Sequence, residues 1–101
     1  MADKSWGDLL HEHCKDLDEQ NGADMKFLGE DSALTSREKY LLAMILDSAA
    51  NKPRGAKGYG ERAVQKGATK DQVMDALRIL RMFAGRPALA TGCEALRQFE
   101  R

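Results

Sequence analysis

The sequence predicts an all-α bundle of five helices, formed by a single domain of 101 residues. Two capping boxes predict helix starts, because Thr35 is followed three residues later by Glu38, and Thr69 by Gln72. No segment carries the apolar–polar alternation of a half-buried strand, and the links between the helical segments are short. Helices joined by short links pack as a bundle.

The first predicted helix covers residues 5–19, with Ser5 as its N-cap. Asn21-Gly22 is expected to end it. Residues 23–34 are expected to form an irregular link, fixed to the core by its apolar side chains. The apolar face of this first helix consists of Trp6, Leu9, Leu10, Cys14 and Leu17.

The second predicted helix begins at the Thr35 capping box and ends near Asn51, because Pro53 disfavours helical geometry in the residue before it. Residues 41–46 are six apolar residues without a break. A helix that is apolar all round is buried all round. The other four helices of so small a monomer cannot enclose it, so the sequence predicts a homo-oligomer.

A basic, glycine-containing loop is expected at residues 51–58, followed by a third helix from Tyr59 to Lys66 with Gly67 as its left-handed cap. The fourth helix begins at the Thr69 capping box and continues to Gly85. The last begins at Pro87 and carries an apolar stripe made of Leu89, Cys93, Leu96 and Phe99.

The formal charge of the chain is zero but unevenly spread. Residues 1–31 hold nine acidic side chains and three lysines, which gives −6, and residues 32–101 hold 13 basic and seven acidic side chains, which gives +6. This division indicates complementarity within or between subunits, or simply solvated faces. The alternative is a basic surface for anionic small molecules. Nucleic acid is not an expected partner, because the basic half lacks interleaved aromatic residues.

The N-terminal residues contain no apolar signal-peptide core, and no apolar run is long enough to span a membrane. Cys14 and Cys93 stand alone, with no CxxC and no metal-ligand spacing. We therefore expect a cytoplasmic protein without a metal or cofactor, in which both cysteines are core or interface residues. His11 and His13 cannot share a helix face, so no metal site is expected there.

Residues 34–97 resemble the carboxymuconolactone decarboxylase family, which includes the alkylhydroperoxidase D-like proteins. The resemblance lies in Arg37-Glu38 ahead of an apolar helix, in Ala63-x-x-x-Gly67-Ala68-Thr69, and in Gly85-x-Pro87-Ala88. It implies an all-helical fold that assembles as a trimer or hexamer. It also implies that residues 34–101 form the family core, with residues 1–33 as an N-terminal helix and link.

Redox-active members of this family carry CxxC at the start of the third helix and a histidine four residues later. Counting back from Gly67 puts the cysteine positions at Lys52 and Gly55 and the histidine position at Tyr59. Counting forward from Glu38 instead puts the cysteines at Ala50 and Pro53. No cysteine stands at any of these positions, so the resemblance implies a non-redox member.

Five residues are candidates for a site. Glu38 matches the family's acid, although its capping box with Thr35 accounts for a glutamate here without any catalytic function. Tyr59 could donate a proton or hold an oxyanion, but its ordinary pKa of about 10 makes it a poor base; it could also simply fill space. If both act, Glu38 and Tyr59 must lie close together. Lys52, Arg54 and Lys57 could bind a carboxylate, or form a solvated basic loop.

The function these residues favour is binding of a small anionic carbonyl or lactone compound at a subunit interface, with acid/base chemistry by Glu38 and Tyr59 if the protein is an enzyme. Such an enzyme would be a lyase rather than a peroxidase. One alternative is a degenerate, non-catalytic oligomeric module for binding or structure. A thiol-dependent alkylhydroperoxidase remains only if Cys14 or Cys93 acts.

We predict no hydroperoxide turnover with dithiol reductants, because a thiol peroxidase needs a thiolate nucleophile and a resolving partner at the motif. A coupled peroxidase assay tests this. Turnover that disappears in the Cys14→Ala, Cys93→Ala double variant would contradict the prediction.

Overall fold

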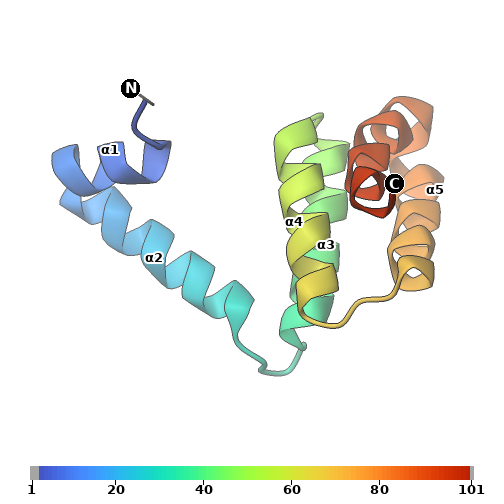
Figure 1. The fold of residues 1–101 in the computed structure, drawn as a ribbon, viewed down its shortest axis with the longest axis horizontal. Helices are drawn as coiled ribbons and strands as arrows, with labels where there is room; N and C mark the ends of the chain where they lie inside the picture. Colours follow the sequence, from blue (N-terminus) through green and yellow to red (C-terminus); the bar gives the residue numbers. More distant parts are fainter. Residues whose placement is uncertain (1–2, 101) are drawn as a thin grey trace. The chain divides into compact units, whose positions relative to one another are not determined.

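Helices make up all the regular structure of residues 3–100, the part of the chain that the computed structural model describes. The prediction of an all-α fold is therefore confirmed. The chain divides into two compact units, Met1–Asp31 and Ser32–Arg101, two residues before the predicted division. In chain order the helices are α1 (Trp6–His13), α2 (Lys15–Gly29), α3 (Ser36–Ala49), α4 (Pro53–Gln65), α5 (Lys70–Gly92) and the 3₁₀ helix η1 (Cys93–Phe99) (Figure 1).

The N-terminal unit begins as predicted, because the side chain of Ser5 accepts a hydrogen bond from the backbone N–H of Asp8. The predicted helix over residues 5–19 is nevertheless broken at Cys14, where the backbone is extended. The predicted stop at Asn21-Gly22 is also wrong, since α2 continues through both residues and reaches Gly29. Neither residue takes the left-handed conformation of a cap, and a glycine inside a helix costs only about 1 kcal/mol relative to alanine.

An ion pair joins α1 to α2 across the break at Cys14. His11 Nδ1 lies 3.0 Å from Asp18 Oδ2, and this hydrogen bond together with the Asp18 charge raises the pKa of His11 above 6.5. The pair therefore contributes to stability while His11 is protonated and is lost as the pH rises through the raised pKa. No residue of α1 or α2 is buried, so this unit has no core of its own.

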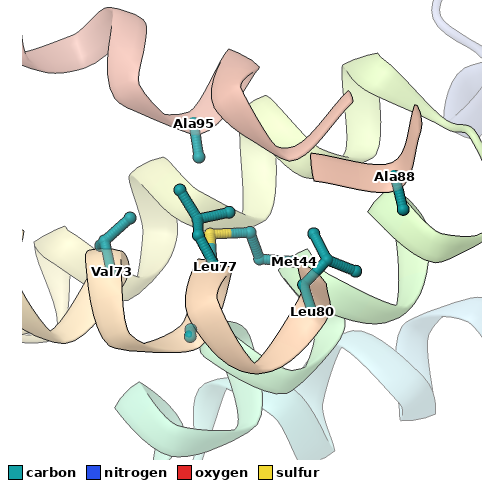
Figure 2. Close-up of a cluster of buried hydrophobic side chains, with 7 residues drawn as sticks. Met44, Val73, Leu77, Leu80, Ala88 and Ala95 are labelled. Carbon is teal, nitrogen blue, oxygen red and sulfur yellow. The ribbon is translucent and has the colours of Figure 1, made fainter. Parts of the chain in front are cut away.

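The second unit is built around one core cluster. Its centre is Met44 of α3, which is completely buried, as are Val73 and, almost entirely, Leu77 on the first half of α5. Figure 2 shows these side chains converging with Leu80, and with Ala88 and Ala95 from the C-terminal end of the chain. Alanine at the last two positions lets the end of the chain approach the helices closely.

Both predicted capping boxes are formed. The Thr35 hydroxyl accepts from the Glu38 backbone N–H (3.1 Å), and a Glu38 carboxylate oxygen accepts from the Thr35 N–H (2.8 Å). The same reciprocal pair links Thr69 and Gln72, at 3.1 and 3.0 Å. The starts of α3 and α5 were thus correctly predicted.

The two glycine predictions are confirmed as well. Gly67 follows α4 with a φ of 101°, and Gly85 has a φ of 84°. Helical geometry is interrupted at Gly85, so α5 consists of two helical stretches, and Pro87 lies at the start of the second.

The predicted loop at residues 51–58 is wrong, because α4 begins at Pro53. Asn51 makes the turn with a φ of 61°, and proline suits the first helical position because its missing N–H would have no partner there. Gly55 serves close packing: a Cβ at this position would lie 1.9 Å from the carboxylate of Asp47 on α3. Tyr59 consequently lies in the second turn of α4 and not in the first.

The apolar run of residues 41–46 is only partly enclosed by its own chain. Met44 is completely buried, whereas Leu42 is 43% and Leu46 67% exposed. The burial expected all round this helix is therefore not supplied within the chain, and the homo-oligomer stays a prediction. Among residues 3–100 no helix is long and apolar enough to cross a membrane.

We predict that Gly60→Ala destabilises the protein and that Gly58→Ala does not, although both residues lie in α4. A Cβ at Gly60 would lie 2.6 Å from the Cβ of Ala95, whereas a Cβ at Gly58 would meet nothing within 4 Å. Overpacking should cost about 1–3 kcal/mol at Gly60, while the better helix propensity of alanine should add up to about 1 kcal/mol at Gly58. Urea denaturation measures both changes, and equal effects of the two variants would contradict the packing at Gly60.

Candidate functional site

An open groove of about 450 Å³ runs between α3 and the first half of α5, entirely within the second unit. Apolar side chains supply most of its lining, and four polar side chains lie among them. The apolar lining residues are Leu34, Leu41, Leu42, Ile45, Ala76 and Ile79, and the polar ones are Arg37, Glu38, Gln72 and Asp75.

Helical spacing brings these residues to one groove. On both helices the lining positions follow the three- and four-residue intervals of a single face. Figure 1 shows α3 and the first half of α5 running in the same direction, with α4 returning between them in the chain. Their N-termini therefore lie at the same end of the groove. The two capping boxes, which include Glu38 and Gln72, lie at that end as well.

Most of the polar groups in the groove are already bound within the chain. Glu38 accepts from the Thr35 N–H, and Asp75 Oδ1 lies 2.8 Å from Arg78 Nη1. Arg37 is half-buried and has no ion-pair or hydrogen-bond partner among residues 3–100. Its Nη1 lies 3.8 Å from the position that a Cβ would occupy at Gly67. Arg37 is thus the cation that remains available to a ligand in the groove.

Tyr59 lies elsewhere, in a stack with Tyr40. The two ring centroids are 6.2 Å apart with the planes at 22°, and the guanidinium carbon of Arg62 lies 5.8 Å from the Tyr59 centroid. Tyr40 of α3 is 7% exposed. Because Tyr40 and Glu38 are two positions apart, they point roughly 200° apart around the helix axis. Tyr59 therefore packs on the side of α3 away from the groove.

Glu38 and Tyr59, which were expected to transfer protons together, therefore lie on different sides of α3. Glu38 lines the groove and Tyr59 does not. Their individual roles stay predictions, but the structure does not bring them into one site. The partner of Tyr59 is Tyr40, which the sequence pattern did not predict. The available signal was that the chain contains only two tyrosines, and that they lie on two neighbouring helices.

The three predicted anion-binding residues lie around the N-terminus of α4. Lys52 is the N-cap residue, and Arg54 and Lys57 are exposed on the helix itself. The pKa of Glu94 is lowered chiefly by its hydrogen bond to Arg97, and Lys57 adds a smaller contribution to the same effect. None of the three lysine and arginine side chains lines the groove. They form a separate basic region.

The cysteines also lie outside the groove. Cys14 is half-buried and Cys93 is exposed, so Cys93 does not lie in the core of its own chain, and its alternative place at an interface stays a prediction. Within residues 3–100, no three His, Cys, Asp or Glu side chains gather as a metal site would require.

The arrangement of helices in this structure is similar to that of a protein of known structure. The structure is similar to the crystal structure of an apo carboxymuconolactone decarboxylase family protein from Legionella pneumophila, with a TM-score of 0.77 and 22% sequence identity over 91% of this chain and 85% of that chain. The chain has the fold of that protein. At this identity the similarity establishes the fold, as the sequence resemblance implied. The sequence matches no protein-family model and no curated protein.

We predict that Glu38→Gln changes stability by less than about 0.5 kcal/mol, while Glu38→Ala lowers it by about 0.5–1 kcal/mol. Glutamine can accept the same backbone hydrogen bond, as Gln72 does at the start of α5. Thermal denaturation of both variants tests this. If the glutamine variant is as unstable as the alanine variant, the carboxylate has a role beyond the capping box.

Proposed function

We propose that this protein is a non-redox member of the carboxymuconolactone decarboxylase family that binds a small anionic carbonyl or lactone compound in the groove between α3 and α5. The observation that carries the proposal is Arg37, a half-buried cation without a partner among the described residues, at the end of an otherwise mainly apolar groove. The residue proposed to bind the anion is therefore Arg37, in place of the basic region of α4.

Charge in the groove supports an anionic ligand in spite of the two carboxylates present. Asp75 is paired with Arg78, and the Glu38 carboxylate accepts from a backbone N–H at the start of α3. The positive ends of the α3 and α5 dipoles lie at the same end of the groove. A carboxylate entering here would meet an arginine able to form two parallel hydrogen bonds.

The apolar lining supports a ligand with a hydrocarbon body. Leu41, Ile45 and Ala76 can cover the faces of a small ring or chain while Arg37 holds its carboxylate. Binding sites for small molecules commonly combine a mainly apolar lining with a few polar groups that fix orientation. A small lactone carrying one carboxylate has both features.

The proposal is one of binding, and not of proton transfer between Glu38 and Tyr59. The two residues lie on different sides of α3, whereas general acid–base partners must reach the same bound atoms at roughly 2.6–3.2 Å. Of the two, Glu38 borders the groove, and the other carboxylate of the groove, Asp75, is paired with Arg78, so any acid/base chemistry there would rest on Glu38 and the ligand itself.

We predict that a γ-lactone carboxylate binds more tightly than its methyl ester, and that Arg37→Gln removes this preference. A charge-assisted hydrogen bond is worth about 1.5–3 kcal/mol, so affinity for the carboxylate should fall by roughly 10- to 100-fold. Affinity for the ester should stay unchanged. Isothermal titration calorimetry with both compounds measures the two affinities.

Arg54→Gln is the matched control, because Arg54 is exposed on α4 and lies outside the groove. It should leave both affinities unchanged. If Arg54→Gln and not Arg37→Gln weakens carboxylate binding, the site is the basic region of α4. If neither compound binds to the unmodified protein, the alternative of a non-catalytic structural module is favoured and the proposed function fails.

A further inference from the structure

The two capping boxes at one end of the groove leave different chemical groups available. In the first box a Glu38 carboxylate oxygen accepts from the Thr35 N–H at 2.8 Å. In the second the amide oxygen of Gln72 accepts from the Thr69 N–H at 3.0 Å. An ionised carboxylate consists of acceptors alone, whereas an amide whose oxygen accepts a hydrogen bond still carries an NH₂ group with two donors. The start of α5 therefore brings a donor to the groove that capping does not use.

The amide of Gln72 has one orientation, because a backbone N–H only donates. The atom that faces the Thr69 N–H is consequently the amide oxygen, and the amide nitrogen Nε2 is directed elsewhere. Nε2 makes no hydrogen bond to the chain within residues 3–100, and Gln72 is one of the lining residues of the groove. Its NH₂ group is thus available to a ligand there.

Arg37 lies near the same end of the groove. Its Nη1 is 3.8 Å from the position that a Cβ would occupy at Gly67, and Gly67 precedes Thr69, the N-cap of α5, by two residues. Gln72 belongs to the first turn of that helix. One charged donor and one uncharged donor therefore lie near the N-terminus of α5, and both residues line the groove.

We propose that Gln72 is a specificity-determining residue of the groove, whose Nε2 donates a hydrogen bond to an uncharged carbonyl oxygen of the ligand while Arg37 binds the ligand's carboxylate. The inference rests on the proposed function, because it concerns the same ligand in the same groove. It adds that the ligand is a monocarboxylate with a second, uncharged carbonyl, such as a lactone acid or a keto acid. A second carboxylate fits less well, since Arg37 is the cation of the lining and the next residue, Glu38, is a carboxylate.

Preorganisation supports this role of Gln72. Its side chain is exposed, so the NH₂ group is hydrated without a ligand, and a ligand carbonyl replaces a water molecule. The capping box already holds the side chain through its oxygen, so binding requires little further loss of side-chain freedom. A site that hydrogen-bonds a ligand group discriminates against an analogue that lacks this group. One hydrogen bond between uncharged groups corresponds to a preference of roughly 2- to 10-fold.

Isothermal titration calorimetry with two compounds of equal charge tests the proposal. The compounds are a γ-lactone carboxylate and a tetrahydrofuran carboxylate, in which a methylene group replaces the ring carbonyl. The unmodified protein should bind the lactone roughly 2- to 10-fold more tightly. Gln72→Glu should remove this preference, because its carboxylate can accept the same backbone N–H, as that of Glu38 does, but has no donor for the carbonyl. The added charge acts on both compounds equally, so the ratio of their affinities is the readout.

Gln72→Met repeats the test without an added charge, and it too should bind the two compounds equally. Thermal denaturation verifies that both Gln72 variants are folded. Gln65→Glu is the matched control, because Gln65 is exposed at the end of α4 and lies outside the groove. It should keep the preference for the lactone. Arg37→Gln should weaken binding of both compounds, since both carry the carboxylate.

The outcomes separate this inference from the proposed function. Equal binding of the two compounds to the unmodified protein would overturn the role of Gln72 and leave carboxylate binding by Arg37 intact. A preference that survives both Gln72 substitutions, or one that Gln65→Glu also removes, would overturn that role as well. Unchanged affinities in Arg37→Gln would count against the proposed function and not against the contact with Gln72. Binding of neither compound would overturn the proposed function and this inference together.

Discussion

Close packing around Met44 is the constraint on which the second unit depends. Met44 is completely buried, and its sulfur would lie 3.2 Å from a Cβ at Gly60. Where α5 meets the core, a Cβ at Gly92 would lie 2.7 Å from a Leu77 methyl group. Interiors packed this closely leave no room for even one added methyl group. The positions of α4, α5 and η1 around α3 are therefore set by residues with small or absent side chains.

This packing also explains why α3 has two different sides. One side carries Tyr40 and Met44 into the core, and Tyr40 stacks on Tyr59. The other side, with Arg37 and Glu38, borders the groove toward α5. A residue on one side cannot exchange protons with a residue on the other, however close the two are in the sequence. The cation of the groove comes from the same turn as the capping glutamate, so the start of α3 serves both the fold and the candidate site.

The N-terminal unit differs from the second unit in its charge and in the burial of its side chains. It holds the acidic part of the chain, and the change from acidic to basic composition coincides with the boundary at Asp31. Its two helices have exposed apolar side chains, Phe27 at 58% among them, and no buried residue. Local hydrogen bonds and the His11–Asp18 pair contribute to these helices, but no side chain of α1 or α2 is fully buried, so burial of apolar area, the main source of stability, is small within the unit.

The sequence by itself determined the features that depend on local hydrogen bonds and backbone geometry. Both capping boxes, the left-handed Gly67 and the break at Gly85 follow from residues that interact with their own neighbours, so reading them required no knowledge of the fold. Only the tertiary structure decided that the glycines near Pro53 belong to a helix and not to a loop. Gly55 predicted a loop, but it lies in a helix, where a Cβ would displace the carboxylate of Asp47 on α3. The stacking of Tyr59 on Tyr40 and the position of Arg37 in the groove likewise depend on the direction in which each residue points around its helix, since contacts between helices depend on packing that no local pattern records.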